Sequence, residues 1–180
     1  NNLKHNLLYP DQKLQQRLQL VPPEEIFGDQ MVVELSRKYV INSAEINGYL
    51  SKLNDKGFFD DINYQDKNRS GWAPKSHLER ILRLSMALED RNSTFFNSRK
   101  LKAQIDLGLS YWFKENLLSL NWWFNEIGVP KVLAEIAIVL DGKLTQQQTA
   151  SIIEITKRSK IKMTGQNKVW LAGIVLIRAL

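Results

Sequence analysis

NWWFNEIGVPKVLAEI, residues 121–136, joins a cluster of aromatic and amide side chains to an apolar helical pattern. Pro130 suits the first turn of a helix, where its missing N–H costs no hydrogen bond, so a helix is predicted to start there. Leu133, Ile136 and Leu140 then recur at the three- and four-residue steps of one helix face. This pattern predicts a helix with one buried side.

Helical periodicity extends outward from this segment in both directions, whereas sustained strand-like alternation is nearly absent. The sequence predicts one helix opening at Pro74 and another capped by Ser93 or Ser98. A third should open with a capping box of Thr145 and Gln148. The positions predicted on the apolar faces of these helices are Leu78, Ile81, Leu82, Ser85, Leu88, Leu101, Ile105, Leu109, Trp112, Ile152, Ile153 and Ile155.

The two ends of the chain have a different character. Residues 1–28 are predicted to be a separate lead-in, and residues 29–180 a helical unit whose first helix is capped by Asp29. Residues 54–71 are polar and predict a long loop. The last segment, from about Asn167, is apolar nearly all round, which predicts burial between other helices. The preceding residues offer few helices to cover it on several sides, so we expect the chain to be a piece of a larger protein.

Composition limits the classes of function. The 180 residues, 43% of them hydrophobic, suffice for about one domain, and no apolar run reaches the roughly 18 residues of a membrane span. The absence of cysteine excludes disulfides, thiolate nucleophiles and cysteine metal sites. The net charge of +6 would attract polyanions. Charge alone does not distinguish nucleic acid, anionic lipid and acidic polysaccharide.

Three adjacent aromatic residues, within residues 122–124, are the most unusual feature. Neighbouring residues on a helix point about 100° apart, so the three cannot all enter one core. Trp122 or Trp123 could therefore offer a flat face to a sugar ring, with Asn125 beside it to bond hydroxyl groups. The alternative is that both tryptophans serve the core and a helix end.

Two further segments carry candidate residues. In TGQN, residues 164–167, a glycine precedes Asn167, whose amide either points outward to a ligand or only caps the helix. The basic residues before it, between 157 and 162, are either a solvated face or an attraction for a polyanion. Trp72 either lies at a cleft rim or packs as a hydrophobic staple. His77, predicted on the polar side of its helix, is either a catalytic base or, as is more usual for a lone histidine, structural.

Taken in order, the Trp-Ala-Pro helix start, NWWFNEIGVPKVLAEI and TGQNK resemble the N-terminal region of polysaccharide lyase family 8, over roughly residues 50–180. That family includes chondroitin AC, hyaluronate and xanthan lyases. The resemblance implies an all-α fold, an incomplete α/α toroid of helical hairpins. It also implies a bacterial, periplasmic or secreted enzyme that needs no metal or other cofactor.

The resemblance further implies that Asn167 is the catalytic asparagine that binds the uronic acid carboxylate. Trp122 and Trp123 resemble the aromatic patch that guides the glycan, with Asn125 and Trp72 lining the same groove. An amide donor on that carboxylate would stabilise the negative charge that develops when the C5 proton is removed. In the family the base and acid, a His and a Tyr, lie downstream, so the isolated chain is expected to be inactive and to need the remainder of its parent.

Two other classes of function remain open at this stage. A non-catalytic carbohydrate-binding helical module would use the tryptophans alone. A nucleic-acid-binding module is disfavoured, because the basic residues are dispersed and no recognised signature is present. The expected partner is therefore an acidic polysaccharide; the sequence does not distinguish chondroitin, hyaluronan and xanthan.

Overall fold

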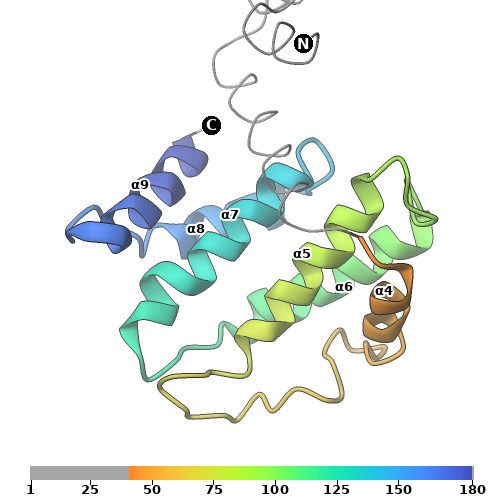
Figure 1. Ribbon diagram of the computed structural model, residues 1–180, viewed down its shortest axis with the longest axis horizontal. Helices are drawn as coiled ribbons and strands as arrows, with labels where there is room; N and C mark the ends of the chain where they lie inside the picture. The colour runs from red at the N-terminus through yellow and green to blue at the C-terminus, as the bar shows by residue number, and fades with distance from the viewer. Residues whose placement is uncertain (1–40, 180) are drawn as a thin grey trace, which may run out of the picture.

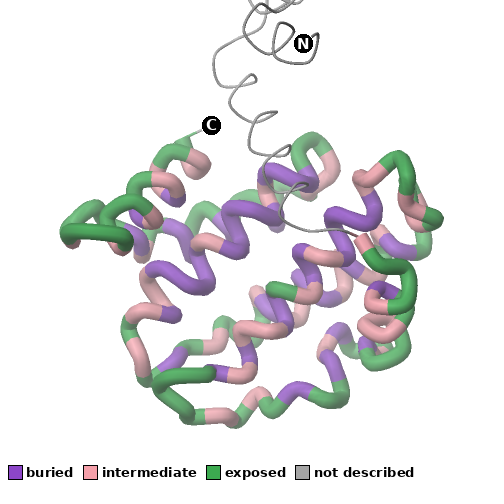
Figure 2. The backbone as a smooth tube through the Cα atoms, viewed as in Figure 1, coloured by how far each residue is buried: buried purple, intermediate pink, exposed green. Residues whose placement is uncertain are grey.

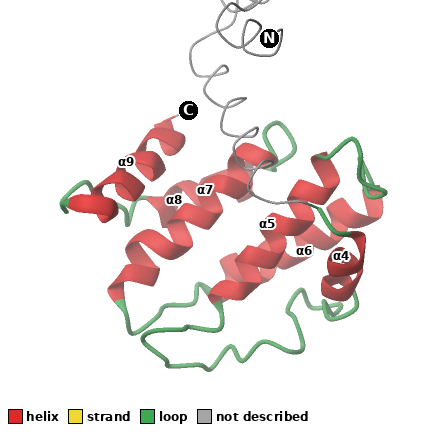
Figure 3. Ribbon diagram, in the orientation of Figure 1, coloured by secondary structure: helices red, strands yellow, loops and turns green. Residues whose placement is uncertain are grey.

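The computed structural model describes residues 41–179, and every regular element in that range is a helix (Figure 1, Figure 3). The elements are α4 (Ser43–Leu50), α5 (Lys75–Glu89), α6 (Arg99–Glu115), the π-helical segment η1 (Phe124–Gly128), α7 (Val129–Val139), α8 (Gln146–Thr156) and α9 (Gly165–Ala179). Within that range β-type pairing is limited to an isolated bridge between Leu53 and Phe59. The all-α prediction is confirmed, and the predicted lead-in and Asp29 cap lie outside the described residues.

The helices form two layers of antiparallel hairpins (Figure 1). α5, α7 and α9 run in the same direction, with α7 packed between the other two. α6 and α8 lie behind them and return the chain, α6 packing on α5 and α8 on α7. This arrangement is the arc of helical hairpins expected of part of an α/α toroid.

The core lies between the two layers and around α7 (Figure 2). α5 and α6 bury the side chains that the sequence predicted, and α7 is buried on nearly every side. Burying each such aliphatic side chain stabilises the fold by about 1.5–3 kcal/mol. The fully buried set includes Leu78, Ile81, Leu101, Ile105, Leu109, Trp112 and Leu133.

Local capping signals were predicted correctly. The Ser98 side chain accepts a hydrogen bond from the Leu101 N–H at 3.2 Å and starts α6. The capping box of Thr145 and Gln148 is formed at the start of α8. The predicted loop at residues 54–71 carries no helix or strand. Caps depend on residues a few positions apart, so the sequence alone predicts them well.

α7 begins at Val129, one residue before the predicted start at Pro130, but it continues an earlier helical segment instead of opening a new helix. The helix begins at Trp122 and passes through η1 into α7, and the Val129 N–H bonds the Phe124 carbonyl in the wider π pattern. Pro130 has no N–H for the Glu126 carbonyl four residues earlier. The Ser159 hydroxyl donates to that carbonyl instead, at 2.6 Å. A bond from outside the helix thus satisfies the group that proline leaves unpaired.

The predicted burial of the last helix also needs correction. α9 packs on α7, η1 and α8, but only Leu171 and Ile174 are buried along it. Val169 is 63% exposed and Leu176 is 46% exposed. Among residues 41–179 this helix is therefore covered on one side only (Figure 2).

Candidate substrate cleft

The first residues of α5, α7 and α9 lie at one edge of the arc, where the loops before these helices also gather (Figure 1). The loop before α5 and the loop before η1 are joined there, because Asn121 Nδ2 donates to the Arg69 carbonyl at 2.7 Å. All the site residues suggested by the sequence belong to these loops or first turns. The fold thus gathers segments about fifty residues apart along the chain.

Trp122 and Trp123 have different environments. Trp122 is 42% exposed, and its ring stacks on no aromatic ring in residues 41–179. The Trp123 ring is half-buried, edge-on to Trp170 at 5.8 Å between ring centroids and to Phe124 at 5.3 Å. One tryptophan therefore offers a flat face to solvent, and the other is fixed among neighbours.

Asn167 lies inside the first turn of α9, two residues after the helix begins. Its side-chain oxygen accepts a hydrogen bond from the Trp123 indole Nε1–H at 3.3 Å. An indole N–H can only donate, so the atom facing it must be Oδ1 and the NH₂ group points away. The amide is thus not used as a helix cap; it is held by a residue from the neighbouring helix.

Asn125 and Trp72 serve the fold. The Asn125 amide makes two bonds of 2.8 Å to the backbone N–H and carbonyl of Ser119, which fixes the loop before η1. Trp72 is 4% exposed, packs against Trp112 and Phe124, and donates its indole N–H to a loop carbonyl. Trp72 is therefore a core residue between α6 and η1, with almost no surface for a sugar.

His77 is fully buried, contrary to its predicted place on the polar side of its helix. Its Nε2–H donates to the Gly108 carbonyl at 3.0 Å, and Nδ1 accepts from the Tyr64 hydroxyl at 2.9 Å. The Tyr64 oxygen in turn accepts from the Phe59 N–H. Burial lowers the pKa of His77 to about 4, so the ring stays neutral. His77 therefore holds the loop against α5 and α6 and cannot reach a substrate.

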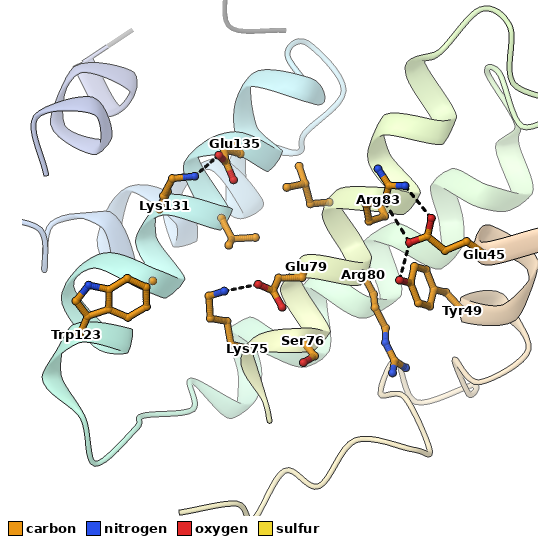
Figure 4. A pocket seen from close by; sticks show the side chains of 13 residues that line it. Glu45, Tyr49, Lys75, Ser76, Glu79, Arg80, Arg83, Trp123, Lys131 and Glu135 are labelled. Carbon is orange, nitrogen blue, oxygen red and sulfur yellow. Dashed lines mark hydrogen bonds and ion pairs between the residues drawn. The ribbon is translucent and has the colours of Figure 1, made fainter. Parts of the chain in front are cut away.

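A groove of about 630 Å³ runs between α4, α5 and α7, with Trp123 and Gly128 at one end (Figure 4). It is a feature that the sequence did not reveal. The Arg83 guanidinium bonds Glu45 at 2.7 Å and holds the pKa of that carboxyl below its ordinary value. The charged residues that line the groove are Lys75, Arg80, Arg83 and Lys131, together with Glu45, Glu79 and Glu135. These cations are largely balanced by adjacent carboxylates.

The basic run before α9 is mostly committed to local pairs. Lys157 bonds Glu154 at 2.9 Å, Lys162 bonds Glu126 at 2.8 Å, and Arg158 donates to the Asn116 side chain at 2.6 Å. Over residues 41–179, no group of three or more His, Cys, Asp or Glu side chains is placed to hold a metal ion. No helix in that range is long and apolar enough to cross a membrane.

Comparison with known proteins identifies the family of this chain. Residues 24–180 match the family described as polysaccharide lyase family 8, N terminal alpha-helical domain. The chain belongs to polysaccharide lyase family 8. Chondroitinase-AC of Pedobacter heparinus is 30% identical over 135 residues, which are 73% of this chain and 19% of that protein. Xanthan lyase of a Bacillus species is 26% identical over 109 residues, 56% of this chain and 12% of the relative.

Solved structures of this family share the fold. A chondroitinase AC lyase, studied in complexes with oligosaccharides, superposes with a TM-score of 0.80 at 26% identity, covering 87% of this chain and 24% of that one. A Paenibacillus xanthan lyase gives a TM-score of 0.69 at 17% identity over 87% of this chain and 18% of its own. The chain spans between about an eighth and a fifth of the length of the curated relatives it matches.

Proposed function

We propose that the full-length protein is a polysaccharide lyase that cleaves uronic-acid-containing glycans, of the chondroitin or hyaluronan type, by β-elimination. The observation that carries the proposal is the fixed amide of Asn167, which turns its NH₂ group away from Trp123 at the edge where three helices begin. Membership of the family and the names of the two relatives support it.

The proposed role of Asn167 follows from the chemistry of elimination. The C5 proton of a uronic acid is only weakly acidic, because its removal adds negative charge beside a carboxylate. An amide N–H that bonds this carboxylate spreads the charge and stabilises the enolate-like transition state. Because the Trp123 N–H already occupies Oδ1, the Asn167 amide meets the carboxylate with donors and not with a repelling oxygen.

Trp122 is the best candidate for contact with the glycan itself. Trp122, in the helical turn before η1, is 42% exposed, so a pyranose could stack on its ring. We include Trp123 and Asn125 in the same cleft wall, where each is half-buried. Trp72 is left out of this proposal because the core encloses it.

The proton-transferring groups are proposed to come from the remainder of the parent chain. His77 is a neutral core residue with both ring nitrogens engaged, and His5 lies outside the described residues. The proposed base and acid lie downstream of Asn167, as the family resemblance implies. A periplasmic or secreted bacterial location is proposed, since the relatives come from bacteria and such polymers are found outside cells.

The test is an assay of the full-length protein on chondroitin, hyaluronan and xanthan. Elimination leaves a C4–C5 double bond, so an active lyase produces an unsaturated uronate that absorbs in the ultraviolet. We expect this absorbance with at least one polymer and none from the isolated 180-residue chain. A protein that binds the polymer through Trp122 but gives no unsaturated product would instead be a carbohydrate-binding module.

A further inference from the structure

We propose that Trp123 is a positioning residue that fixes which way the Asn167 amide points, and that its contribution to turnover comes from its N–H group. This inference rests on the proposed lyase function. It assigns to the two adjacent tryptophans two separate tasks, a stacking surface at Trp122 and an orienting donor at Trp123. In the sequence the two tryptophans resemble a single aromatic patch.

The first support is the direction of the hydrogen bond. An asparagine amide can turn over and exchange its oxygen and NH₂ group, and the two orientations have nearly the same shape. Facing a carboxylate, one orientation attracts and the other repels. The Trp123 Nε1–H, 3.3 Å from Asn167 Oδ1, favours the attracting orientation because an indole N–H cannot accept a bond. No second bond to the Asn167 side chain occurs within residues 41–179.

The second support is the way the Trp123 ring is itself held. A Cβ atom on Gly128 would lie 2.8 Å from Trp123 Cζ3, so the absence of a side chain at Gly128 makes room for the ring. Residues five apart on an α-helix point about 140° apart. The wider turn of η1 is what brings Gly128 beneath Trp123, and Trp170 closes the other side edge-on. Short π-helical segments are often found at functional sites.

The third support is the different attachment of the two helices. η1 continues into α7, which is buried on nearly every side, whereas α9 has only two buried residues. The Trp123–Asn167 bond therefore ties an amide on the less covered helix to the best-packed helix of the described region. The Trp123 N–H therefore acts on catalysis through the amide that it orients.

The test compares substitutions at position 123 in the full-length enzyme, using the unsaturated-product assay. Trp123→Phe keeps an aromatic face and removes the N–H. Incorporation of 3-benzothienylalanine keeps the two-ring shape and removes only the donor, in case the smaller ring disturbs packing. We expect both changes to lower kcat by about 10- to 100-fold, as for a slightly misplaced catalytic group, with KM nearly unchanged.

Two comparisons separate positioning from stacking and from general loss of stability. In an Asn167→Ala background, Trp123→Phe should lower kcat no further, because the amide that it orients is gone. Tyr64→Phe is the matched control: it removes another aromatic donor, in the His77 network, and should lower stability while leaving kcat intact. A raised KM with unchanged kcat, or losses that multiply in the double variant, would overturn the proposal.

A spectroscopic readout keeps the inference separate from the lyase assignment. In full-length protein labelled with 5-fluorotryptophan, Trp123→Phe identifies the fluorine resonance of Trp123. Asn167→Ala should shift that resonance, because it removes the partner of the indole N–H. An unshifted resonance contradicts the contact whatever the activity. A shifted resonance in a protein that makes no unsaturated product supports the contact and rejects the lyase function.

Discussion

α7 and α9 are both rich in apolar residues, yet they differ in how many of those residues are buried. α7 is enclosed by α5, α8, α9 and η1, and nine of its eleven residues are buried. α9 buries Leu171 and Ile174 and leaves Val169 and Leu176 exposed among residues 41–179. Apolar composition thus indicates that a helix will be covered, but not by which elements. The candidate site spans the two helices, with its tryptophans in the helical turn that leads through η1 into α7 and its asparagine in the first turn of α9.

The largest expected difference concerns core truncation on the two helices. Leu133→Ala on α7, at a fully buried position, should lower the free energy of unfolding of the chain by about 2–5 kcal/mol. Val169→Ala on α9 should change it by less than about 0.5 kcal/mol. Leu171→Ala, on the covered side of α9, is the matched control and should resemble Leu133→Ala.

Urea denaturation of the isolated chain measures all three variants. Equal losses for the Val169 and Leu171 variants would mean that α9 is covered on both sides, which would remove the contrast with α7. Repeating the Val169 substitution in the full-length protein then sharpens the comparison. A loss that appears only there would show that a further part of the parent covers α9.

The hairpin of α5 and α6 offers a pH-dependent test of the well-packed region. The pKa of His77 is about 4 when folded, against an ordinary value of 6.5, so the unfolded chain binds the proton first. Stability from His77 is therefore fully present above about pH 6.5 and lost as the pH falls towards 4. Between these pH values the free energy of unfolding loses about 3 kcal/mol of contribution from His77.

This prediction is measured by denaturation at several pH values, with His77→Phe as the comparison because carboxyl groups also titrate in acid. The difference in free energy of unfolding between the unmodified protein and His77→Phe should change between pH 6.5 and pH 4. A constant difference across that interval would contradict the buried neutral histidine.

A smaller effect is expected where proline interrupts the helix. Ser159→Ala should lower stability by about 1–3 kcal/mol, because the Glu126 carbonyl loses its donor while Pro130 supplies none. In a Pro130→Ala background the backbone N–H can return to that carbonyl, so the same Ser159 substitution should cost less. Equal costs in the two backgrounds, measured by urea denaturation, would show that the two residues do not share the carbonyl.

The sequence predicted those parts of the fold that depend on nearby residues. The Ser98 cap, the capping box of Thr145 and the inward positions of α5 and α6 follow from spacings of a few residues. The start of α7 was predicted to within one residue, but the helical segment before it was missed. A proline that opens a new helix and Pro130, whose missing N–H is replaced by the Ser159 hydroxyl, look alike in sequence. The signal that could have helped was the helical pattern already present before Pro130.

The candidate site was only partly accessible from sequence. Asn167 and Trp123 were both candidates from the residue pattern, and the family resemblance supplied their roles. Their contact was not predicted, because it joins residues 44 positions apart. The resemblance placed Trp72 at a cleft, because periodicity does not tell which residues surround a ring. His77 was predicted on a polar face, because periodicity does not tell that a helix is covered by neighbours on more than one side. Gly128 drew no attention, since its role is the space that it leaves for Trp123.

The central claim is that the Asn167 amide stabilises charge that develops only in the transition state, and the most direct test is Asn167→Ala in the full-length protein. Gln166→Ala, an exposed neighbour in the same first turn, is the control and should leave turnover intact. The account predicts that Asn167→Ala lowers kcat by about 10²–10³ with little change in KM and an unchanged fold by circular dichroism. Normal turnover in that variant would contradict it.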